Sequence, residues 1–223
     1  SGVVAEGVAN QIPLASELSG QPDAIIDFSV PQACEAILKL AANAGIPLVV
    51  ATTGLTLEQQ EKVNETSRQI PIVWAPNMSL AVNLTMKLVS QAAAALTQVT
   101  SGVDVEVIDR HHRFKEDSPS GTALKFGELI AAEMGQTVHQ HGRQGILGQR
   151  PRNEIGYHAL RVGDNPGEHT IVFGMLGEVI ELTVRSTNRD CYALGALEAA
   201  KFVAGKPAGI YSMYDVLNLK SQA

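Results

Sequence analysis

The chain has 223 residues, and its 17 basic and 23 acidic side chains give a formal net charge of −6. This length fits one large domain or two small ones, and a hydrophobic content of 45% is ample for a core. The net acidity argues against a nucleic-acid-binding protein that relies on bulk positive charge. No run of residues approaches the ~18 consecutive apolar residues that a membrane-spanning helix needs.

The cysteines and the first residues indicate where the protein works. Cys34 and Cys191 lie far apart and form no CxxC pair, which is typical of a protein from a reducing compartment. The chain starts without a basic region followed by an apolar core, so no signal peptide is predicted. We therefore expect a soluble cytoplasmic protein with neither a membrane nor a nucleic acid as its partner.

The first part of the chain alternates short apolar strands with helices. Three nearly continuous apolar runs predict strands at 23–28, 47–51 and 71–75. Two helices are predicted between them, one from Pro31 to Ala44 and one from a capping box at Thr56 to about Gln69. Such an alternation is typical of parallel βαβ units. The loops that follow the strands would then share the carboxyl edge of one sheet, where ligands bind.

The second part of the chain follows a different pattern. Helices are predicted at 80–96, at 120–134 and at 191–204, and strands at 103–107, 156–162, 168–174 and 179–185. The polar, Gly-rich and Arg-rich segment 139–153 is interpreted as a loop. The last three strands have no helices between them, which favours an open mixed or antiparallel sheet covered on one face. The last helix is expected to return to the first sheet.

The densest polar cluster follows the strand that is predicted to end near Ile108. Arg110 to Lys115 hold three permanent cations and the adjacent histidines His111 and His112. A solvated basic turn is the plainer interpretation, and it stays open at this point. No carboxylate is spaced as in an HExxH motif, so a metal site is not predicted. The functional interpretation is an anion pocket with a proton donor, because Lys and Arg bind carboxylates and His or Lys delivers protons near neutral pH.

A predicted helix N-terminus follows the cluster directly. Ser120 or Thr122 is expected to cap this helix, and capping alone would explain either residue. Gly121 lets a ligand approach the backbone, and the free N–H groups of a helix N-terminus attract anions. The combination predicts a cradle for a carboxylate. A GxGxxG phosphate loop is missing from the sequence, since no two of its 20 glycines are separated by exactly one residue.

Residues 107–124 read VIDRHHRFKEDSPSGTAL. This run closely resembles the signature E-x-HHxxKxDxPSGTA of the 4-hydroxy-tetrahydrodipicolinate (dihydrodipicolinate) reductase family. Weaker matches to the same family follow in the expected order at 26–29, 51–54, 76–79, 167–169, 209–211 and 216–217. The resemblance therefore covers essentially the whole chain.

The resemblance implies reduction of a cyclic imine-type dicarboxylate by NADH or NADPH, on the bacterial route to diaminopimelate and lysine. His111 would then be a proton donor and acceptor, and Lys115 a second proton donor. Substrate carboxylates would be held by His112, Lys115 and the backbone around Ser120, Gly121 and Thr122. The cofactor would be lined by Phe28, Ala51, Thr52, Thr53, Ala75, Pro76, Asn77 and Met78, with Arg189 also reaching it.

The resemblance further implies an α/β fold of two domains and a homotetramer. Residues 1–79 and 189–223 would form a Rossmann-like, dinucleotide-binding domain, and residues 80–188 an α+β domain for substrate binding and tetramerisation with an open mixed sheet. Family members open with a strand, a Gly-rich loop, a helix and a second strand, and these roughly fifty residues find no match here. The first domain is therefore expected to be N-terminally incomplete, and the choice between NADH and NADPH is not predicted.

Two other functions stay open. One is a different imine or amino-acid oxidoreductase on the same architecture, which would not need the pair His111 and Lys115. The other is a non-catalytic binding or assembly module, whose only support is the missing Gly-rich loop.

Overall fold

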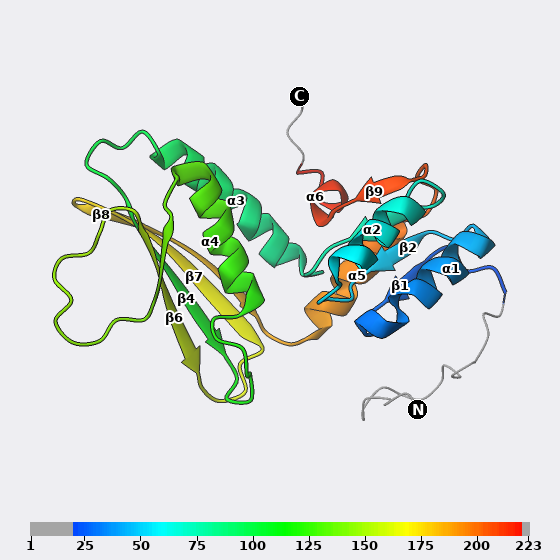
Figure 1. Cartoon of the computed structure of the whole chain (residues 1–223), viewed down its shortest axis with the longest axis horizontal. Helices are drawn as coiled ribbons and strands as arrows, with labels where there is room; N and C mark the ends of the chain where they lie inside the picture. Colours follow the sequence, from blue (N-terminus) through cyan, green and yellow to red (C-terminus); the bar gives the residue numbers. More distant parts are fainter. Residues whose placement is uncertain (1–19, 220–223) are drawn as a thin grey trace.

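The computed structural model describes residues 20–219. They form two α/β units that lie side by side, each built on its own sheet (Figure 1). The expectation of an N-terminally incomplete first domain concerns family elements that would precede the matched segment, so the described residues do not test it. None of the helices within 20–219 has the length and apolar character that crossing a membrane requires.

The first unit is a parallel four-stranded sheet with the order β1-β2-β3-β9. Its strands are β1 (Ile25–Asp27), β2 (Leu48–Val50), β3 (Pro71–Trp74) and β9 (Gly209–Tyr211). Its helices are α1 (Cys34–Ala44) after the 3-10 turn η1 (Pro31–Ala33), α2 (Leu57–Thr66), α5 (Asp190–Val203) and α6 (Met213–Val216). The predicted βαβ pattern is confirmed, and so is the return of the last long helix, α5, to this sheet.

Both faces of the first sheet are covered, which explains why its strands are apolar throughout. Leu48, Val50 and Ile72 belong to the core that includes α1 and α2. Their neighbours Val49 and Val73 point the other way, into the core formed with α5 and α6. The alternation of side chains along a strand thus distributes consecutive apolar residues between two separate cores.

Helix α5 approaches the loop after β3 without any side chain between them. A Cβ atom at Gly195 would lie 1.8 Å from the carbonyl oxygen of Met78. We therefore expect Gly195→Ala to lower the free energy of unfolding by about 1–3 kcal/mol, because backbone would have to move. Urea unfolding measures this change, with Leu197→Ala on the exposed side of α5 as the control. Unchanged stability of Gly195→Ala would contradict the close approach.

The second unit is an open mixed sheet of five strands with the order β5-β6-β4-β7-β8. The strands β5 and β6 are parallel, as are β6 and β4, whereas β7 is antiparallel to both of its neighbours. The elements are α3 (Leu80–Leu96), β4 (Asp104–His111), α4 (Gly121–Met134), β5 (Val138–His141), β6 (Glu154–Arg161), β7 (Gly167–Met175) and β8 (Glu178–Ser186). This topology confirms the predicted mixed sheet.

Helices α3 and α4 cover one face of the second sheet (Figure 1). Phe126 and Ile130 of α4 are fully buried against this sheet. Tyr157 of β6 also enters this core, and its ring fits because Gly127 of α4 has no side chain. The packing fixes α4 on the sheet and thereby fixes the position of its N-terminus.

Four details of the sequence prediction are wrong. Strand β4 continues to His111 instead of ending near Ile108, so the polar cluster begins inside the strand. Strand β5 lies where a loop was expected; three of its four residues are polar, in keeping with the exposure of most of the strand. Helix α2 ends at Thr66, before Gln69. The short strand β9 was not expected, because only pairing with β3 far along the chain makes it a strand.

Candidate active site

A cleft of about 690 Å³ lies where the two units meet. The second unit contributes the end of β4, the loop after it and the N-terminus of α4, and the first unit contributes the loops after β2 and β3. All six residues predicted to contact substrate line it: His111, His112, Lys115, Ser120, Gly121 and Thr122. Arg189, which was predicted to reach the cofactor, lines the same cleft.

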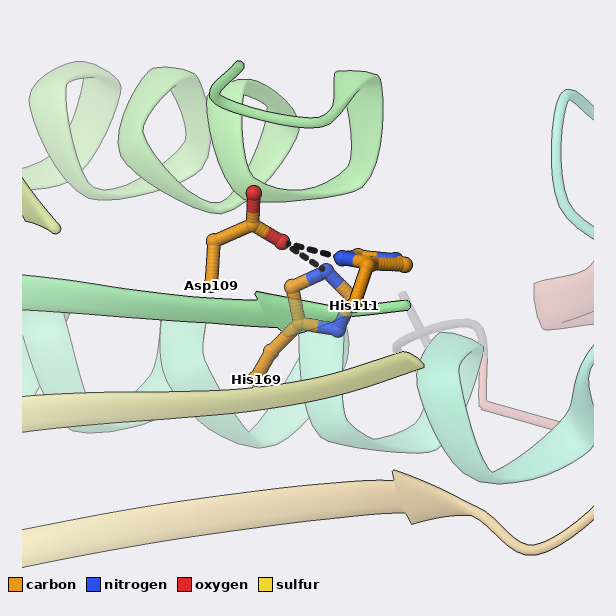
Figure 2. A group of neighbouring side chains, drawn as sticks. All are labelled: Asp109, His111 and His169. Carbon is orange, nitrogen blue, oxygen red and sulfur yellow. Dashed lines mark ion pairs between the residues drawn. The ribbon is translucent and has the colours of Figure 1, made fainter. Parts of the chain in front are cut away.

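Strand geometry places His111 beside a buried carboxylate. Asp109 and His111 are two residues apart on β4, so their side chains share one face of the sheet. His169 lies directly opposite Asp109 on the antiparallel neighbour β7. Figure 2 shows both imidazoles pointing toward one oxygen of the Asp109 carboxylate. His111 Nδ1 lies 2.8 Å and His169 Nε2 3.3 Å from Asp109 Oδ1.

Asp109 is fully buried, and both of its oxygens have several partners. Besides the two imidazoles, Oδ1 accepts a hydrogen bond from the Ser120 hydroxyl at 3.0 Å. Oδ2 accepts from the Ser120 N–H at 2.8 Å and from Arg161 Nη2 at 3.0 Å. Burial acts to raise the pKa of Asp109, but the contacts with His111, His169, Ser120 and Arg161 outweigh it and hold the pKa well below its usual range. The carboxylate therefore stays ionised.

The trio Asp109, His111 and His169 has the spacing of a metal site, since one ligand atom from each lies within 4.8 Å of the others. A divalent cation here would face the guanidinium of Arg161, which lies 3.0 Å from Asp109 Oδ2. The Ser120 hydroxyl and N–H also point at the same carboxylate. The Arg161 cation and the Ser120 donors stabilise the negative charge of Asp109 without a metal ion.

The loop after β4 places the side chains of His112 and Lys115 in the cleft. The loop is held in place by its backbone, since its N–H groups donate to the β6–β7 loop, with His112 N donating to Asn165 O at 2.7 Å. Arg189 Nη2 lies 3.3 Å from His112 Nε2. Desolvation lowers the pKa of His112, and the charges of Arg189, His111, Lys115 and Arg161 lower it further. The cleft is thus suited to an anion.

Lys115 has a carboxylate partner within the same loop. Its Nζ lies 2.7 Å from Asp117 Oδ1. The hydrogen bond from Lys115 lowers the pKa of Asp117, and the backbone of Gly121 at the start of α4 contributes to the same shift. Asp117 therefore contacts two of the groups that were predicted to hold a substrate carboxylate.

Ser120 is the N-cap of α4. Its hydroxyl accepts from Ala123 N at 3.2 Å, while its own N–H and O–H donate to Asp109. Capping was one of the two interpretations of Ser120, and the structure adds the bond to Asp109. Since these bonds occupy the Ser120 donors, a ligand is left with the Thr122 amide and with the Gly121 amide that Asp117 contacts here.

A second cleft, of about 340 Å³, opens at the carboxyl edge of the parallel sheet. It shares Thr53, Pro76, Asn77 and Tyr192 with the first cleft. Predicted cofactor residues line it as follows: Phe28, Ala51, Thr52, Thr53, Pro76, Asn77 and Met78. Ala75 does not line either cleft, because its side chain is buried in the core formed with α5.

Hydrogen bonds fix the loops of this second cleft. Asp27 at the end of β1 accepts from Ser29 N at 2.8 Å and from the Thr52 hydroxyl at 2.9 Å, which joins the loops after β1 and β2. Asn77 Nδ2 donates to the Thr122 hydroxyl at 3.3 Å. This bond connects the loop after β3 to the first turn of α4, and so connects the two clefts.

Sequence reasoning assigned no role to Asp109, Arg161, His169 or Tyr192. A strand that continued to His111 would have revealed Asp109, since residues two apart share a face. His169 and Arg161 come from β7 and β6, and only the register of the sheet brings them to Asp109. Tyr192 belongs to no motif that would have pointed to the site.

The chain is similar to known proteins over nearly its whole length. The profile of "Dihydrodipicolinate reductase, N-terminus" matches residues 3–78, and that of "Dihydrodipicolinate reductase, C-terminus" matches residues 81–217. A 4-hydroxy-tetrahydrodipicolinate reductase from Rhodopirellula baltica is 57% identical over 98% of this chain and 81% of its own length. One from Aromatoleum aromaticum is 45% identical over 89% of this chain and 72% of its own length.

Solved structures agree with these matches. A dipicolinate-bound dihydrodipicolinate reductase from Paenisporosarcina sp. TG-14 superposes with a TM-score of 0.71 at 26% identity. The superposition covers 87% of this chain and 73% of the other. The predicted α/β fold, with a Rossmann-like parallel sheet and a second mixed sheet, is thereby confirmed. The chain belongs to the dihydrodipicolinate reductase family.

Proposed function

We propose that this protein reduces 4-hydroxy-tetrahydrodipicolinate to tetrahydrodipicolinate with NADH or NADPH, in the synthesis of diaminopimelate and lysine. The observation that carries the proposal is the pair of connected clefts. One brings His111, Lys115 and the N-terminus of α4 together, as a dicarboxylate that takes up a proton requires. The other lies at the carboxyl edge of a parallel sheet, where nucleotides bind.

The residues of the second cleft fit the nicotinamide end of the cofactor. The side chain of Phe28 is 53% exposed at the end of β1, although it is apolar. Beside it lie Ala51, Thr52 and Thr53, whose small side chains leave the strand-end backbone accessible. Phe28, the 51–53 loop and the 76–78 loop would hold this part of the cofactor. Bound NADH or NADPH supplies the hydride.

The first cleft would bind and protonate the substrate. Lys115, His112 and the amides of Gly121 and Thr122 offer positive charge and hydrogen bonds to two carboxylates. His111 Nδ1 faces Asp109, which leaves Nε2 as the nitrogen that exchanges a proton with the substrate. Lys115 is the second group that gives up a proton. The Asn77–Thr122 hydrogen bond keeps the substrate side next to the cofactor side.

The direct test follows the absorbance of NADH and of NADPH while the protein is mixed with freshly generated 4-hydroxy-tetrahydrodipicolinate. We expect oxidation of the dinucleotide that stops when the substrate is used up. Oxidation with a free amino-acid or other imine substrate, and none with this one, would favour a different oxidoreductase. Binding of substrate without any turnover would favour the non-catalytic module.

Asp117 is expected to compete with the substrate, because its carboxylate already contacts Lys115 and the start of α4. Replacing it by asparagine frees these groups, so we expect KM for the substrate to fall roughly two- to fivefold, in keeping with the modest strength of an exposed ion pair. Glu128→Gln is the matched control, since Glu128 lines the same cleft but pairs with Lys125. A higher KM in Asp117→Asn than in this control would show that Asp117 helps to hold the substrate.

We propose a homotetramer built through the second sheet. No helix in the described part of the chain covers the face opposite α3 and α4 (Figure 1). Leu160 is 38% and Val162 57% exposed in and just after β6, and Val179 of β8 is 57% exposed. Light scattering coupled to size-exclusion chromatography should give four times the mass of one chain. A monomeric mass at micromolar concentration would contradict the proposal.

The domain roles and the location also stay proposals. We assign dinucleotide binding to residues 1–79 and 189–223, which alone line the second cleft, and substrate binding to residues 80–188, which supply most of the lining of the first cleft. We assign the protein to the cytoplasm. The support is that Cys34 and Cys191 are both free.

A further inference from the structure

The Asp109 carboxylate connects groups from four separate elements. It belongs to β4, and its partners come from the end of the same strand (His111), from β7 (His169), from β6 (Arg161) and from the N-cap of α4 (Ser120). None of its surface is exposed. A buried charge with a full set of partners holds those partners in one arrangement, because losing any of them leaves polar groups unpaired.

The Asp109 carboxylate orients the imidazole ring of His111. His111 Nδ1, at 2.8 Å, is the ring nitrogen that faces the ionised carboxylate, which accepts hydrogen bonds but does not donate them, so the contact favours the form of the ring with its hydrogen on Nδ1. Nε2 is then the nitrogen on the other side of the ring. A Cβ at Gly167 would come within 3.0 Å of Nε2, so the absence of a side chain at Gly167 leaves room for it.

The Asp109 carboxylate also holds in place the first turn of α4, where a substrate carboxylate is proposed to bind. Ser120 donates both its N–H and its hydroxyl to Asp109, and the hydroxyl also accepts from Ala123 N inside the first turn. This turn presents Gly121 and Thr122 to the cleft. Arg161 extends the connection, since its Nη2 also donates to Asp117 O at 2.7 Å. Asp109 therefore contacts both the group that would move the proton and the backbone that would hold the substrate.

We propose that Asp109 is a positioning residue that keeps His111 in its Nδ1–H form and at a set distance from the N-terminus of α4. This inference rests on the proposed function, because it takes His111 as the proton donor and the first turn of α4 as the carboxylate cradle. Asp109 does not touch the substrate; it acts through His111 and Ser120. The consequence is that a bound carboxylate and His111 Nε2 are aligned before the reaction begins.

A double-mutant cycle separates this role from a structural one. In the otherwise unchanged protein, Asp109→Asn should lower kcat by about 10²-fold, with a smaller change in KM, because the amide is uncharged and can turn its NH2 donor toward the ring. In a His111→Ala background the same change should cost less than about threefold in kcat, since no imidazole is left to position, and the part of the effect that acts through Ser120 should remain as a change in KM. Asp104→Asn is the control: Asp104 lies on the same strand, with an exposed side chain that pairs with Arg150. It should leave kcat unchanged.

A full effect of Asp109→Asn in the His111→Ala background would overturn the proposal, because it would assign the loss to the fold alone. So would a kcat within about threefold of normal for Asp109→Asn in the otherwise unchanged protein. Asp109→Glu keeps the carboxylate and should recover part of the lost kcat.

A measurement on the unaltered protein guards against variants that fail to fold. The ¹⁵N chemical shifts of His111, assigned by comparison with His111→Gln, report which nitrogen carries the hydrogen in the neutral ring. We expect the Nδ1–H form; the Nε2–H form would overturn the proposal. This readout does not depend on turnover. A protein that shows the Nδ1–H form but oxidises neither NADH nor NADPH would refute the proposed function and leave the Asp109–His111 arrangement standing.

Discussion

Lys115→Ala is expected to lower kcat/KM for 4-hydroxy-tetrahydrodipicolinate by about 10²–10⁴-fold, the range of a well-placed acid–base group. Two physical effects contribute. The ammonium group is one of the few permanent cations lining the cleft, so a substrate carboxylate loses its charged partner. The same group is a proposed proton donor, so the chemical step slows as well. Steady-state kinetics at saturating NADH or NADPH measures both effects.

Two further variants separate binding from proton transfer. Lys115→Arg keeps a permanent cation but does not release a proton near neutral pH, so KM should stay close to normal while kcat falls. Lys125→Ala removes a cation from the same cleft, but this lysine pairs with Glu128 on the surface of α4. It should change kcat/KM far less. Equal losses in Lys115→Ala and Lys125→Ala would mean that only the overall charge of the cleft matters.

His111→Ala is expected to lower kcat by about 10²–10⁴-fold with little change in KM. His111 is 7% exposed, and its Nε2 is the atom proposed to exchange a proton with the substrate. Removing it takes away a proton donor while Lys115, Gly121 and Thr122 still bind the carboxylates. The kcat and KM values from one substrate titration separate the two contributions.

The variant needs a control for stability, because it leaves the buried Asp109 with one partner fewer. His111→Gln keeps an amide that can donate to Asp109 and should lose activity to a similar extent. His158→Ala removes a histidine that pairs with Glu106 and does not line the first cleft, so it should stay active. A His111→Ala protein with near-normal kcat would remove His111 from the mechanism.

Strands with both faces buried were readily predicted from the sequence. The runs at β2 and β3 are continuous and apolar because α1 and α2 cover one face and α5 covers the other. Strand β4 was underestimated because its last residues, Asp109 to His111, are polar. They are polar because they belong to the site, so local preference and function disagree at that point.

On the substrate side, the residues predicted from the sequence are neighbours along the chain. His111, His112, Lys115 and the start of α4 lie in one short stretch, and the structure brings them to one cleft. His169 and Arg161 reach Asp109 through the register of β7 and β6, which no local pattern contains. Ala75 shows the opposite error, since it lies next to cleft residues but points into the core.

The path of the chain has a consequence for folding during synthesis. Residues 80–188 form one continuous unit with its own core, whereas the first sheet needs α5 and β9 from the end of the chain. Val49 and Val73 gain their partners Ala196 and Val203 only after the whole second unit has left the ribosome. The later unit in the sequence can thus complete its fold first. Until α5 arrives, the earlier strands expose an apolar face that chaperones recognise.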